Sequence, residues 1–333
     1  MTKLPKITDL DVAGKRVLLR LDLDCDPDPN DWRIKSSTET LDFLKEKGAK
    51  IVILAHRGRP NGKIDESLSL KPFQSIFDKW GATVEENLRF DSGEETNDLE
   101  FAKKLALLGD VYINEAFASS HRNHASIVGL PKLLPHAAGF RFAKEVENLS
   151  KVIPSASSGP QRPVVFLLSG VKEDKLSYLP GIKKFADKIL IGGRLPDYMG
   201  DEKLVSVRTR GENEQVIVGN LTMDKEDITL NTIDRFSLEV KKAGTVVVSG
   251  PMGKYEDEGH CQGTERVLTA VVENKDAYKV AGGGDTEKAI AFCGVEGFSW
   301  ISVGGGAMLE FLVNKTLPGI EALRSGNVNI DRG

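Results

Sequence analysis

The chain has 333 residues, 40% of them hydrophobic and 28% charged, with a formal net charge of −4 at pH 7. This composition is ordinary for a globular enzyme, and so weak a negative charge gives no reason to expect nucleic acid or an acidic membrane as a partner. Because the length exceeds what one hydrophobic core usually serves, two domains are expected.

The N-terminal sequence MTKLPKITDLDVAGKR lacks the apolar core of a signal peptide, and no apolar stretch is long enough to span a bilayer. The three cysteines, Cys25, Cys261 and Cys293, fit no metal-binding or redox spacing. We therefore expect a cytoplasmic protein with reduced cysteines.

Short β-rich runs alternate with amphipathic helical stretches along the whole chain. In the first half, the pattern predicts strands at 17–21, 51–54 and 111–113 and helices at 38–47, 71–80 and 98–107. In the second half, it predicts strands at 164–168, 189–191, 246–248, 279–281 and 300–303 and a helix at 307–313. Such alternation indicates βαβ units and parallel sheets covered by helices. In these sheets, ligands bind at the carboxyl ends of the strands.

One segment in the middle of the chain is typical of a domain boundary. Phe142, Val146, Leu149 and Ile153 recur at helical spacing, and the segment 154–160 that follows is rich in proline, serine and glycine. Small, polar and proline-rich residues after a helix favour a linker. We therefore expect one domain over 1–153 and a second over 160–314; a long surface loop within a single domain is the alternative.

Charged residues follow the predicted strands of the first half. If their loops share one sheet edge, the arginines at positions 33, 59, 89 and 122 converge with His56. Several guanidinium groups at one edge would make a bidentate site for phosphate or carboxylate, and Asp22 could accept a hydrogen bond from a ligand hydroxyl. A single arginine is more often a solvated surface residue or a weak ion-pair partner. His121 and His124 could equally cap or pack.

The predicted strands of the second half end in glycine instead. The strand-end sequences are Gly192-Gly193, Gly250-Pro251-Met252-Gly253, Gly282-Gly283-Gly284-Asp285 and Gly304-Gly305-Gly306. Glycines that open helices let backbone N–H groups approach an anion, so these turns predict a polyphosphate site.

Two charged residues fit the same site. Lys172 follows a glycine-containing strand end and could reach a phosphate, although an exposed lysine at a helix start is equally common. Asp285 is placed to hold a magnesium ion on nucleotide phosphates, or to cap a helix with Thr286 as a second candidate. No GxGxxG follows a strand and no GxxxxGK[ST] occurs, so a dinucleotide oxidoreductase or a P-loop ATPase is unsupported.

Several stretches of the sequence together resemble one known family. They are KRVLLRLDLD, GAKIVILAHRGRP, ENLRF, GDVYINEAFASSHRNHAS, LPHAAGF, SGPMGKYE, GGGDT, GGGAMLEFL and LPGIEAL, and they occur in the order in which that family carries them. They extend over nearly the whole chain. On these motifs the chain resembles the phosphoglycerate kinases.

The resemblance implies two Rossmann-like, three-layer α/β/α domains with parallel sheets, joined by an interdomain helix and closing like a hinge. Residues 1–153 would bind 3-phosphoglycerate, with the tail 315–333 packing back on them, and residues 160–314 would bind MgADP or MgATP. The implied reaction is the reversible transfer of a phosphoryl group between 1,3-bisphosphoglycerate and ADP in glycolysis, catalysed by a monomer.

The resemblance also implies roles for individual residues. The substrate-binding residues would be Asp22, Asp24, Arg33, His56, Arg59, Arg89 and Arg122. The nucleotide site would consist of Gly170, Lys172, Lys175, Gly192, Gly193, Pro251, Gly253, Glu256, Gly284, Asp285, Thr286 and Gly305. Within these sets Arg33 and Lys172 would be catalytic, Glu256 would bind the ribose, and Asp285 would hold Mg²⁺.

The sequence departs from the family pattern at several positions. Asp24 stands where the family usually has asparagine, Ser249 replaces an asparagine, and Arg194 and Pro196 follow the glycine pair where small or apolar residues are usual. Lys172 and Lys175 are one residue closer than usual, and the chain is on the order of tens of residues shorter, chiefly between 193 and 245. These departures leave two alternatives: a catalytically weak or inactive relative that binds anions or nucleotides, and a kinase of another small carboxylate.

Overall fold

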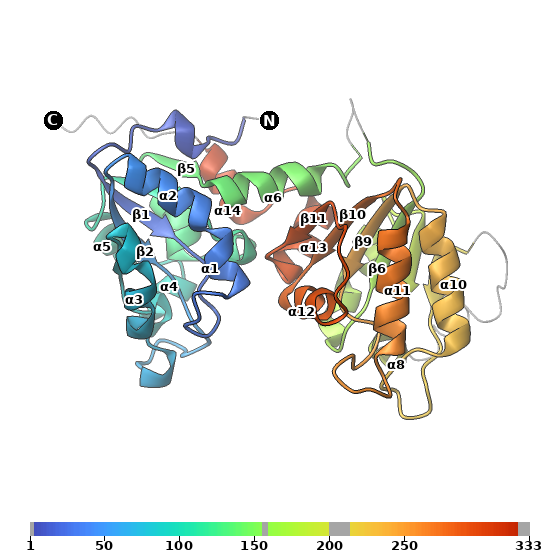
Figure 1. Cartoon of the computed structure of the whole chain (residues 1–333). Coiled ribbons are helices and arrows are strands. Elements are labelled where there is room, and N and C mark those ends of the chain that lie inside the picture. Colours follow the sequence, from blue (N-terminus) through green and yellow to red (C-terminus); the bar gives the residue numbers. More distant parts are fainter. Residues whose placement is uncertain (1–2, 155–158, 200–213, 326–333) are drawn as a thin grey trace. The chain divides into compact units, whose positions relative to one another are not determined.

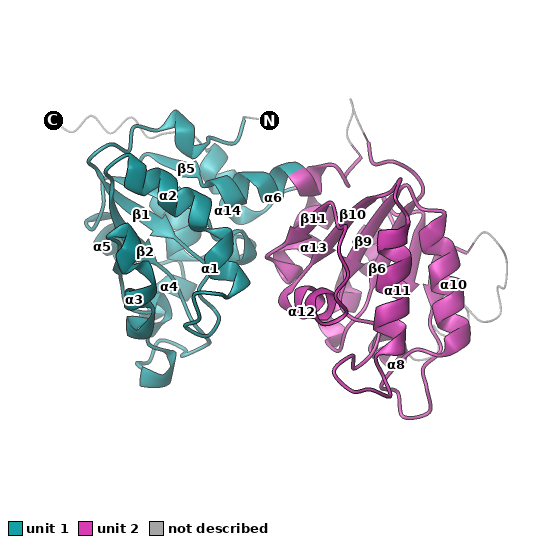
Figure 2. Cartoon of the chain, viewed as in Figure 1, with its two compact units in different colours: residues 1–147, 316–333 teal, residues 148–315 magenta. Residues whose placement is uncertain are grey.

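The computed structural model describes residues 3–154, 159–199 and 214–325. The chain divides into two compact units, which Figure 2 shows in different colours. Unit 1 comprises residues 1–147 and 316–333, and unit 2 comprises residues 148–315. The division falls within helix α6 (Phe140–Ser150), a few residues before the proline-rich segment 154–160, part of which lies outside the described residues.

The sheet of unit 1 has five parallel strands in the order β3-β2-β1-β4-β5. The strands are β1 (Arg16–Arg20), β2 (Lys50–Leu54), β3 (Thr83–Val84), β4 (Val111–Asn114) and β5 (His136–Ala138). In register, Val17 of β1 pairs with Ile51 on one side and Val111 on the other. The central strands are nearly continuous aliphatic runs because helices bury both faces of a parallel sheet.

Alternate residues of this sheet face a core formed with the helices that follow β1 and β2. Val17, Leu19 and Ile53 pack there with Leu41 and Phe77. The helices of unit 1, labelled in Figure 1, are α1 (Trp32–Ser36), α2 (Thr38–Glu46), α3 (Gln74–Phe77), α4 (Ser92–Glu95), α5 (Leu99–Ala106) and α14 (Pro318–Arg324).

Helix α14 belongs to unit 1 although it comes near the end of the sequence. Its Ala322 packs with Ile127 and Val128, and the amide of Gly319 donates to the carbonyl of Ser120 at 2.9 Å. A ring nitrogen of His136 also lies 3.2 Å from the carbonyl oxygen of Leu323. The last described residues therefore complete the fold of the N-terminal unit.

The sheet of unit 2 has six parallel strands in the order β11-β10-β9-β6-β7-β8. The strands are β6 (Val164–Leu168), β7 (Lys188–Ile191), β8 (Val216–Val218), β9 (Thr245–Ser249), β10 (Tyr278–Gly282) and β11 (Trp300–Ser302). Every residue of β6 and β9 is buried, as expected for central strands covered on both faces.

Helices cover both faces of this second sheet. Val165 and Leu167 point into a core shared with Phe236 and Val271, whereas Phe166, between them, makes an edge-to-face ring contact with Phe185. The helices of unit 2 are α7 (Leu179–Ile182), α8 (Leu195–Tyr198), α10 (Leu230–Lys241), α11 (Gln262–Glu273), α12 (Gly284–Phe292) and α13 (Gly305–Asn314).

The prediction of two α/β units with parallel sheets is confirmed. The segment 71–80 is helical as expected, but only Gln74–Phe77 has α geometry and both ends tighten into 3₁₀ turns. Pro72 in the first turn and Gly81, in the left-handed conformation after the last, limit the α-helix there. No helix within 3–154, 159–199 or 214–325 is both long and apolar enough to cross a membrane.

Candidate active site

Both sheets have a point at which the strand order reverses. In unit 1 the chain runs outward from β1 to β3 and then returns to place β4 on the other side of β1. In unit 2 it runs outward from β6 to β8 and returns to place β9 beside β6. Ligands of open parallel sheets bind outside the carboxyl ends of the strands at this point. The candidate residues of each unit follow these strands.

In unit 1 the last residue of β1, Arg20, is fully buried and contacts His56 after β2. Its Nη2 lies 2.7 Å from Nδ1 of His56, and its Nε donates to Ser126 at 2.9 Å. A guanidinium can only donate, so Nδ1 of His56 must be the acceptor and the proton must reside on Nε2. Burial, followed by the charge of Arg20, holds the pKa of His56 well below its usual value. His56 is therefore a neutral donor.

A buried carboxylate, Glu94, contacts both Ser126 and Arg20 and so stabilises the contact between Arg20 and His56. Glu94 of α4 accepts hydrogen bonds from the hydroxyl and the amide of Ser126, at 2.6 and 2.9 Å. It also lies 4.0 Å from Arg20 and 3.6 Å from His124. Burial alone would raise the pKa of Glu94, but His124, Arg20 and Ser126 lower it below its usual value. Glu94 thus stays ionised and balances the Arg20 charge.

Arg89, after β3 in unit 1, has incomplete hydrogen bonding. It is 1% exposed, its Nη1 donates to the carbonyl of Gly58 at 2.6 Å, and its Nε lies 3.2 Å from Glu95. Within the described residues, Nε and Nη2 are buried without a hydrogen-bond partner. Burial and the neighbouring charge of Arg122 lower the pKa of Arg89. Buried donors without partners beside a second cation are suited to an anionic ligand.

The structure brings most of the predicted substrate residues into this region. Arg89, His124 and Arg122 all act electrostatically on His56. Together with Arg20 and His56 they form what we call the unit 1 arginine–histidine cluster. Arg33 of α1 lies 3.4 Å from Asp22, whose pKa burial raises against the effect of that guanidinium. His121, also near Arg122, has its pKa lowered to about 4 by burial and by that charge.

Two predicted substrate residues differ from the others, Asp24 in its hydrogen bonding and Arg59 in its exposure, although the charge of Asp24 still acts on Arg89 and Arg33. The carboxylate of Asp24 accepts a hydrogen bond from the amide of Gly58 at 2.8 Å, so it is engaged with the loop after β2. The Arg59 side chain is exposed and makes no hydrogen bond or ion pair with the described part of the chain. The roles implied for both residues stay predictions.

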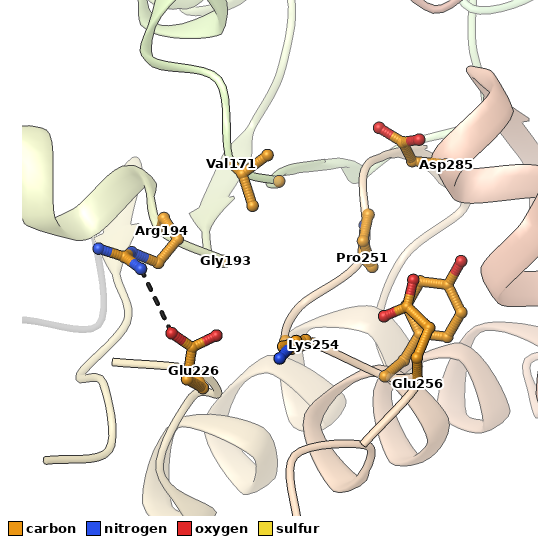
Figure 3. Close-up of a pocket in the computed structure, with 11 residues that line it drawn as sticks. Val171, Gly193, Arg194, Glu226, Pro251, Lys254, Glu256 and Asp285 are labelled. Carbon is orange, nitrogen blue, oxygen red and sulfur yellow. Dashed lines mark hydrogen bonds and ion pairs between the residues drawn. The ribbon is translucent and has the colours of Figure 1, made fainter. Parts of the chain in front are cut away.

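Unit 2 contains a pocket of about 460 Å³ at the carboxyl ends of β6 and β9. We call it the unit 2 pocket. Figure 3 shows Asp285 and Glu256 on one side of it and Arg194 and Glu226 on the other. Its lining consists of Gly170, Val171, Gly193, Arg194, Glu226, Pro251, Gly253, Lys254, Tyr255, Glu256 and Asp285. A pocket of this size is typical of small-molecule sites.

Glycines let the loops around this pocket approach one another. Gly193 has φ of 59°, and a Cβ there would lie 2.5 Å from the amide nitrogen of Gly170. Gly250 has φ of 106° and would place a Cβ against the backbone of Ser169. Any other residue at these two positions would therefore be strained as well as crowded. This geometry explains why these strands end in glycine.

The two lysines after β6 have different environments. Lys172 is exposed at the start of a 3₁₀ turn. Lys175 instead donates to the carbonyl oxygens of Ser169 and Ser249, at 2.7 and 3.3 Å. Burial lowers the pKa of Lys175 to about 8, partly opposed by the charge of Asp285. Lys175 therefore joins the ends of β6 and β9 beneath the glycine loops.

Several predicted nucleotide residues do not line the unit 2 pocket; they are Lys172, Lys175, Gly192, Gly284, Thr286 and Gly305. Thr286 is buried, and its hydroxyl accepts from the amide of Gly250 and donates to the carbonyl of Gly282. Gly305 faces Gly283, where a Cβ would crowd that backbone. Thr286 and Gly305 thus hold the loops in place. Direct contact of any of the six residues with a nucleotide stays a prediction.

Sequence reasoning missed other residues of the two sites. In unit 1 these are Arg20 and Glu94; a charged residue inside the apolar run of β1 was a detectable signal for Arg20, because arginine is rarely fully buried unless it is paired. In unit 2 the missed lining residues are Val171, Arg194, Glu226, Lys254 and Tyr255. Glu226 lies in a loop with no motif, so only the tertiary structure identifies it.

The donor set of unit 2 bears on the predicted magnesium ion. No group of three or more potential metal ligands occurs among the residues that the structure describes. Asp285 is a single carboxylate on the pocket wall, at the N-terminal turn of α12. Mg²⁺ is commonly held by one or two carboxylates together with substrate phosphates and water. Asp285 therefore fits an ion that arrives with a nucleotide, and not a resident protein-bound metal.

The model of the family described as phosphoglycerate kinase matches this chain over residues 7–85, 78–215 and 201–315. The chain belongs to the phosphoglycerate kinase family. A phosphoglycerate kinase of Dictyoglomus turgidum is 34% identical over 391 aligned positions, covering 96% of this chain and 98% of the relative. One from Coprothermobacter proteolyticus is 33% identical, covering 96% and 99%. The aligned spans exceed the length of this chain, so the relatives contain residues that it lacks.

Solved structures of phosphoglycerate kinases are similar over the whole chain. The structure from Coxiella burnetii has a TM-score of 0.81 and 28% identity, covering 97% of this chain and 99% of its own. The structure from Pyrococcus horikoshii has a TM-score of 0.79 and 25% identity, covering 96% and 98%. Phosphoglycerate kinases are glycolytic phosphotransferases that act on 3-phosphoglycerate and ATP or ADP. The family resemblance of the motifs is thus confirmed.

Proposed function

We propose that this protein catalyses the reversible transfer of a phosphoryl group between 1,3-bisphosphoglycerate and ADP, giving 3-phosphoglycerate and ATP. The observation that carries the proposal is Arg89, a buried guanidinium with two nitrogens lacking a hydrogen-bond partner among the described residues, beside Arg122 and His56. Glu95 satisfies this buried cation only in part, and its two nitrogens without hydrogen bonds suit a further anion. The phosphate and carboxylate of phosphoglycerate supply it.

The unit 2 pocket supports the second half of the proposal. The loops after β6, β7 and β9 meet there through glycines, and the wall includes Asp285. Bare backbone amides at such turns bind phosphate oxygens. Mg²⁺, arriving with the nucleotide, would neutralise charge on the phosphates, and Asp285 would hold it.

The described residues of the two sites include no obvious acid–base pair, and the proposed reaction needs none. In the direction that consumes ATP, the nucleophile is the carboxylate of 3-phosphoglycerate, which is already ionised at neutral pH. Catalysis then consists of positioning the reactants and stabilising charge on the transferred group. Lys172, exposed beside the pocket loops, would supply positive charge to that group, and Arg33 would do so from unit 1.

The two sites belong to different units, and the family resemblance implies that a hinge closure brings both to the same phosphoryl group. We include this hinge closure in the proposal because the transfer of a phosphoryl group to the acceptor must exclude water as a competing acceptor. The family resemblance implies a monomer, and we include the monomer as the active form in the proposal. The free cysteines Cys25, Cys261 and Cys293 support action in the reducing cytoplasm.

A coupled assay tests the proposal directly. Purified protein, 3-phosphoglycerate and a magnesium nucleoside triphosphate are combined with glyceraldehyde-3-phosphate dehydrogenase and NADH, so that formation of the acyl phosphate consumes NADH. Turnover that depends on 3-phosphoglycerate supports the proposal. Binding of both ligands without turnover would identify the inactive relative, and turnover only with another small carboxylate would identify the other kinase.

A further inference from the structure

The unit 2 pocket has two chemically different sides. Figure 3 shows Asp285 and Glu256 on one side and Arg194 and Glu226 on the other, with Val171 and Pro251 between them. Asp285 lies at the start of α12, Arg194 immediately precedes α8, and Glu226 lies in the loop between β8 and α10. A ligand that fills the pocket must therefore satisfy a different set of charges at each end.

The proposed function, on which this inference rests, decides which end holds the phosphates. The N-terminal turn of α12 offers backbone amides as well as Asp285, which suits Mg²⁺-bound phosphates. The nucleobase then lies at the side of Arg194 and Glu226. Val171 and Pro251 offer apolar atoms to the faces of a planar ring. The edge of that ring meets charged groups.

Arg194 and Glu226 retain bonding capacity toward a ligand. Arg194 Nη1 lies 3.4 Å from Glu226 Oε1, a long contact for an ion pair, and the two side chains are 37% and 34% exposed. Arg194 Nε is buried without a hydrogen-bond partner among the described residues. The backbone of Glu226 is anchored, since its carbonyl accepts from the amide of Lys254 at 2.8 Å. A fixed loop thus presents a carboxylate that is only partly engaged.

The neighbouring charges are engaged elsewhere. The ammonium of Lys254 lies 2.8 Å from Asp257, and that of Lys225 lies 2.8 Å from Asp197. Asp197 also lies 3.9 Å from Arg194, which keeps the guanidinium at this side of the pocket. Arg194 and Glu226 are therefore the charged pair with which a base edge has to bond.

We propose that this pair makes the pocket selective for guanine, so that GDP and GTP are the preferred nucleotides. Guanine presents two acceptors, O6 and N7, which an arginine binds, and two neighbouring donors, N1–H and the N2 amino group, which a carboxylate accepts. Adenine presents its N6 amino donor and the N1 acceptor instead. Adenine also has the N7 acceptor, but in the same orientation its N6 amino group faces Arg194 and its N1 acceptor faces Glu226. Each of these partly exposed charges therefore loses hydrogen bonds that guanine offers.

Isothermal titration of GDP, IDP and ADP, with Mg²⁺ and without phosphoglycerate, tests the inference on the intact protein. GDP should bind at least about tenfold more tightly than ADP. IDP keeps O6 and N1–H but lacks the N2 amino group, so its affinity should lie between the two. Equal or tighter binding of ADP overturns the proposal.

Substitutions assign the effect to the pair. Glu226→Gln replaces one acceptor by an amide N–H₂ and should weaken GDP binding about tenfold or more while leaving ADP binding unchanged or stronger. Arg194→Gln should also reduce the ratio of GDP to ADP affinity. The matched control is Asp234→Asn, a carboxylate paired with Arg266 between α10 and α11, which should not change the ratio. Retained ADP binding shows that each variant is folded, and an unchanged ratio in Glu226→Gln rejects the assignment.

Steady-state turnover with 3-phosphoglycerate separates this inference from the proposed function. If neither GTP nor ATP supports turnover but GDP binds more tightly, the proposed function fails and the guanine preference stands. If ATP supports faster turnover and ADP binds more tightly, the function stands and the guanine preference is wrong.

Discussion

Arg20 Nη2 lies 2.7 Å from Nδ1 of His56, and both side chains are buried at the carboxyl edge of the unit 1 sheet. This contact determines which ring nitrogen of His56 carries the proton, because the guanidinium has no lone pair to offer. His56 therefore presents an Nε2–H donor whatever the pH in the neutral range. Such an N–H donor can bind an oxygen atom of a ligand.

We predict that ¹⁵N NMR of the imidazoles will show His56 as the neutral Nε2–H tautomer and still uncharged well below its usual pKa, because burial and Arg20 oppose protonation. His260 is an internal control, since a hydrogen bond to Asp224 raises its pKa. The native state then binds fewer protons than the unfolded state as pH falls below about 6.5. The titration of His56 should therefore make the free energy of unfolding fall as the pH is lowered through that range. A charged His56 at pH 6 would contradict the geometry.

Arg89→Met should separate binding from stability. Removing this guanidinium relieves its burial cost and the repulsion from Arg122, but it also removes the partner of the Gly58 carbonyl and of Glu95. The free energy of unfolding should therefore change by no more than about 1 kcal/mol in either direction. The KM for 3-phosphoglycerate should rise at least tenfold, about the effect of losing one charge-assisted bidentate contact. Urea unfolding and steady-state kinetics measure the two effects. The control is Arg16→Met, which breaks an ion pair with Asp110 at the other end of β1. This variant should leave the KM for 3-phosphoglycerate unchanged.

Glu115 connects β4 to the start of α6 and should make stability depend on pH. Its carboxylate accepts from the amides of Arg141 and Phe142, at 3.1 and 3.0 Å, and from the hydroxyl of Thr40. Burial raises its pKa from 4.5 to about 7. Between these values the native state binds more protons than the unfolded state, so this group makes the free energy of unfolding fall as pH rises from about 4.5 to 7.

Glu115→Gln should remove this contribution and cost about 1–3 kcal/mol, because the amide N–H₂ faces backbone donors. Urea unfolding at a series of pH values measures both the free energy of unfolding and its dependence on pH. A variant with the same slope as the original protein between pH 5 and 7 would show that Glu115 is not the titrating group.

Lys172→Met and Lys175→Met form a matched pair. Lys172 is exposed, so its loss should leave the free energy of unfolding within about 0.5 kcal/mol while lowering kcat about 100-fold or more with a modest change in KM. Lys175 donates to the buried carbonyl of Ser169, so its loss removes that donor and should cost about 1–3 kcal/mol, whereas the carbonyl of Ser249 keeps its bond from the Ser169 amide.

The pH dependence of the Lys175 variant gives a second measurement. With a folded pKa of about 8 against 10.5 unfolded, Lys175 makes the free energy of unfolding rise with pH between these values. Thermal melts from pH 8 to 10 should show this rise in the original protein and a smaller one in Lys175→Met. If Lys172→Met instead raised KM and left kcat unchanged, Lys172 would belong to ground-state binding.

The layered α/β fold could be predicted from the sequence, because the alternation of aliphatic strands with amphipathic helices leaves few other ways to bury both. The sequence also determined that strands of the second half end in glycine loops, as the positive φ at Gly193 and Gly250 requires. These are local properties, which depend on short stretches of consecutive residues. The family motifs are of the same kind.

Which side chains meet could not be predicted from the sequence and is known from the three-dimensional arrangement. Glu94 lies far along the chain from Arg20, yet its carboxylate is what allows that arginine to be buried beside His56. Arg194 and Glu226 face one pocket although no motif joins them, and Thr286 bonds to the loops instead of lining the pocket. The reason is physical: a buried charge needs a partner close in space, and folding brings that partner from any part of the sequence.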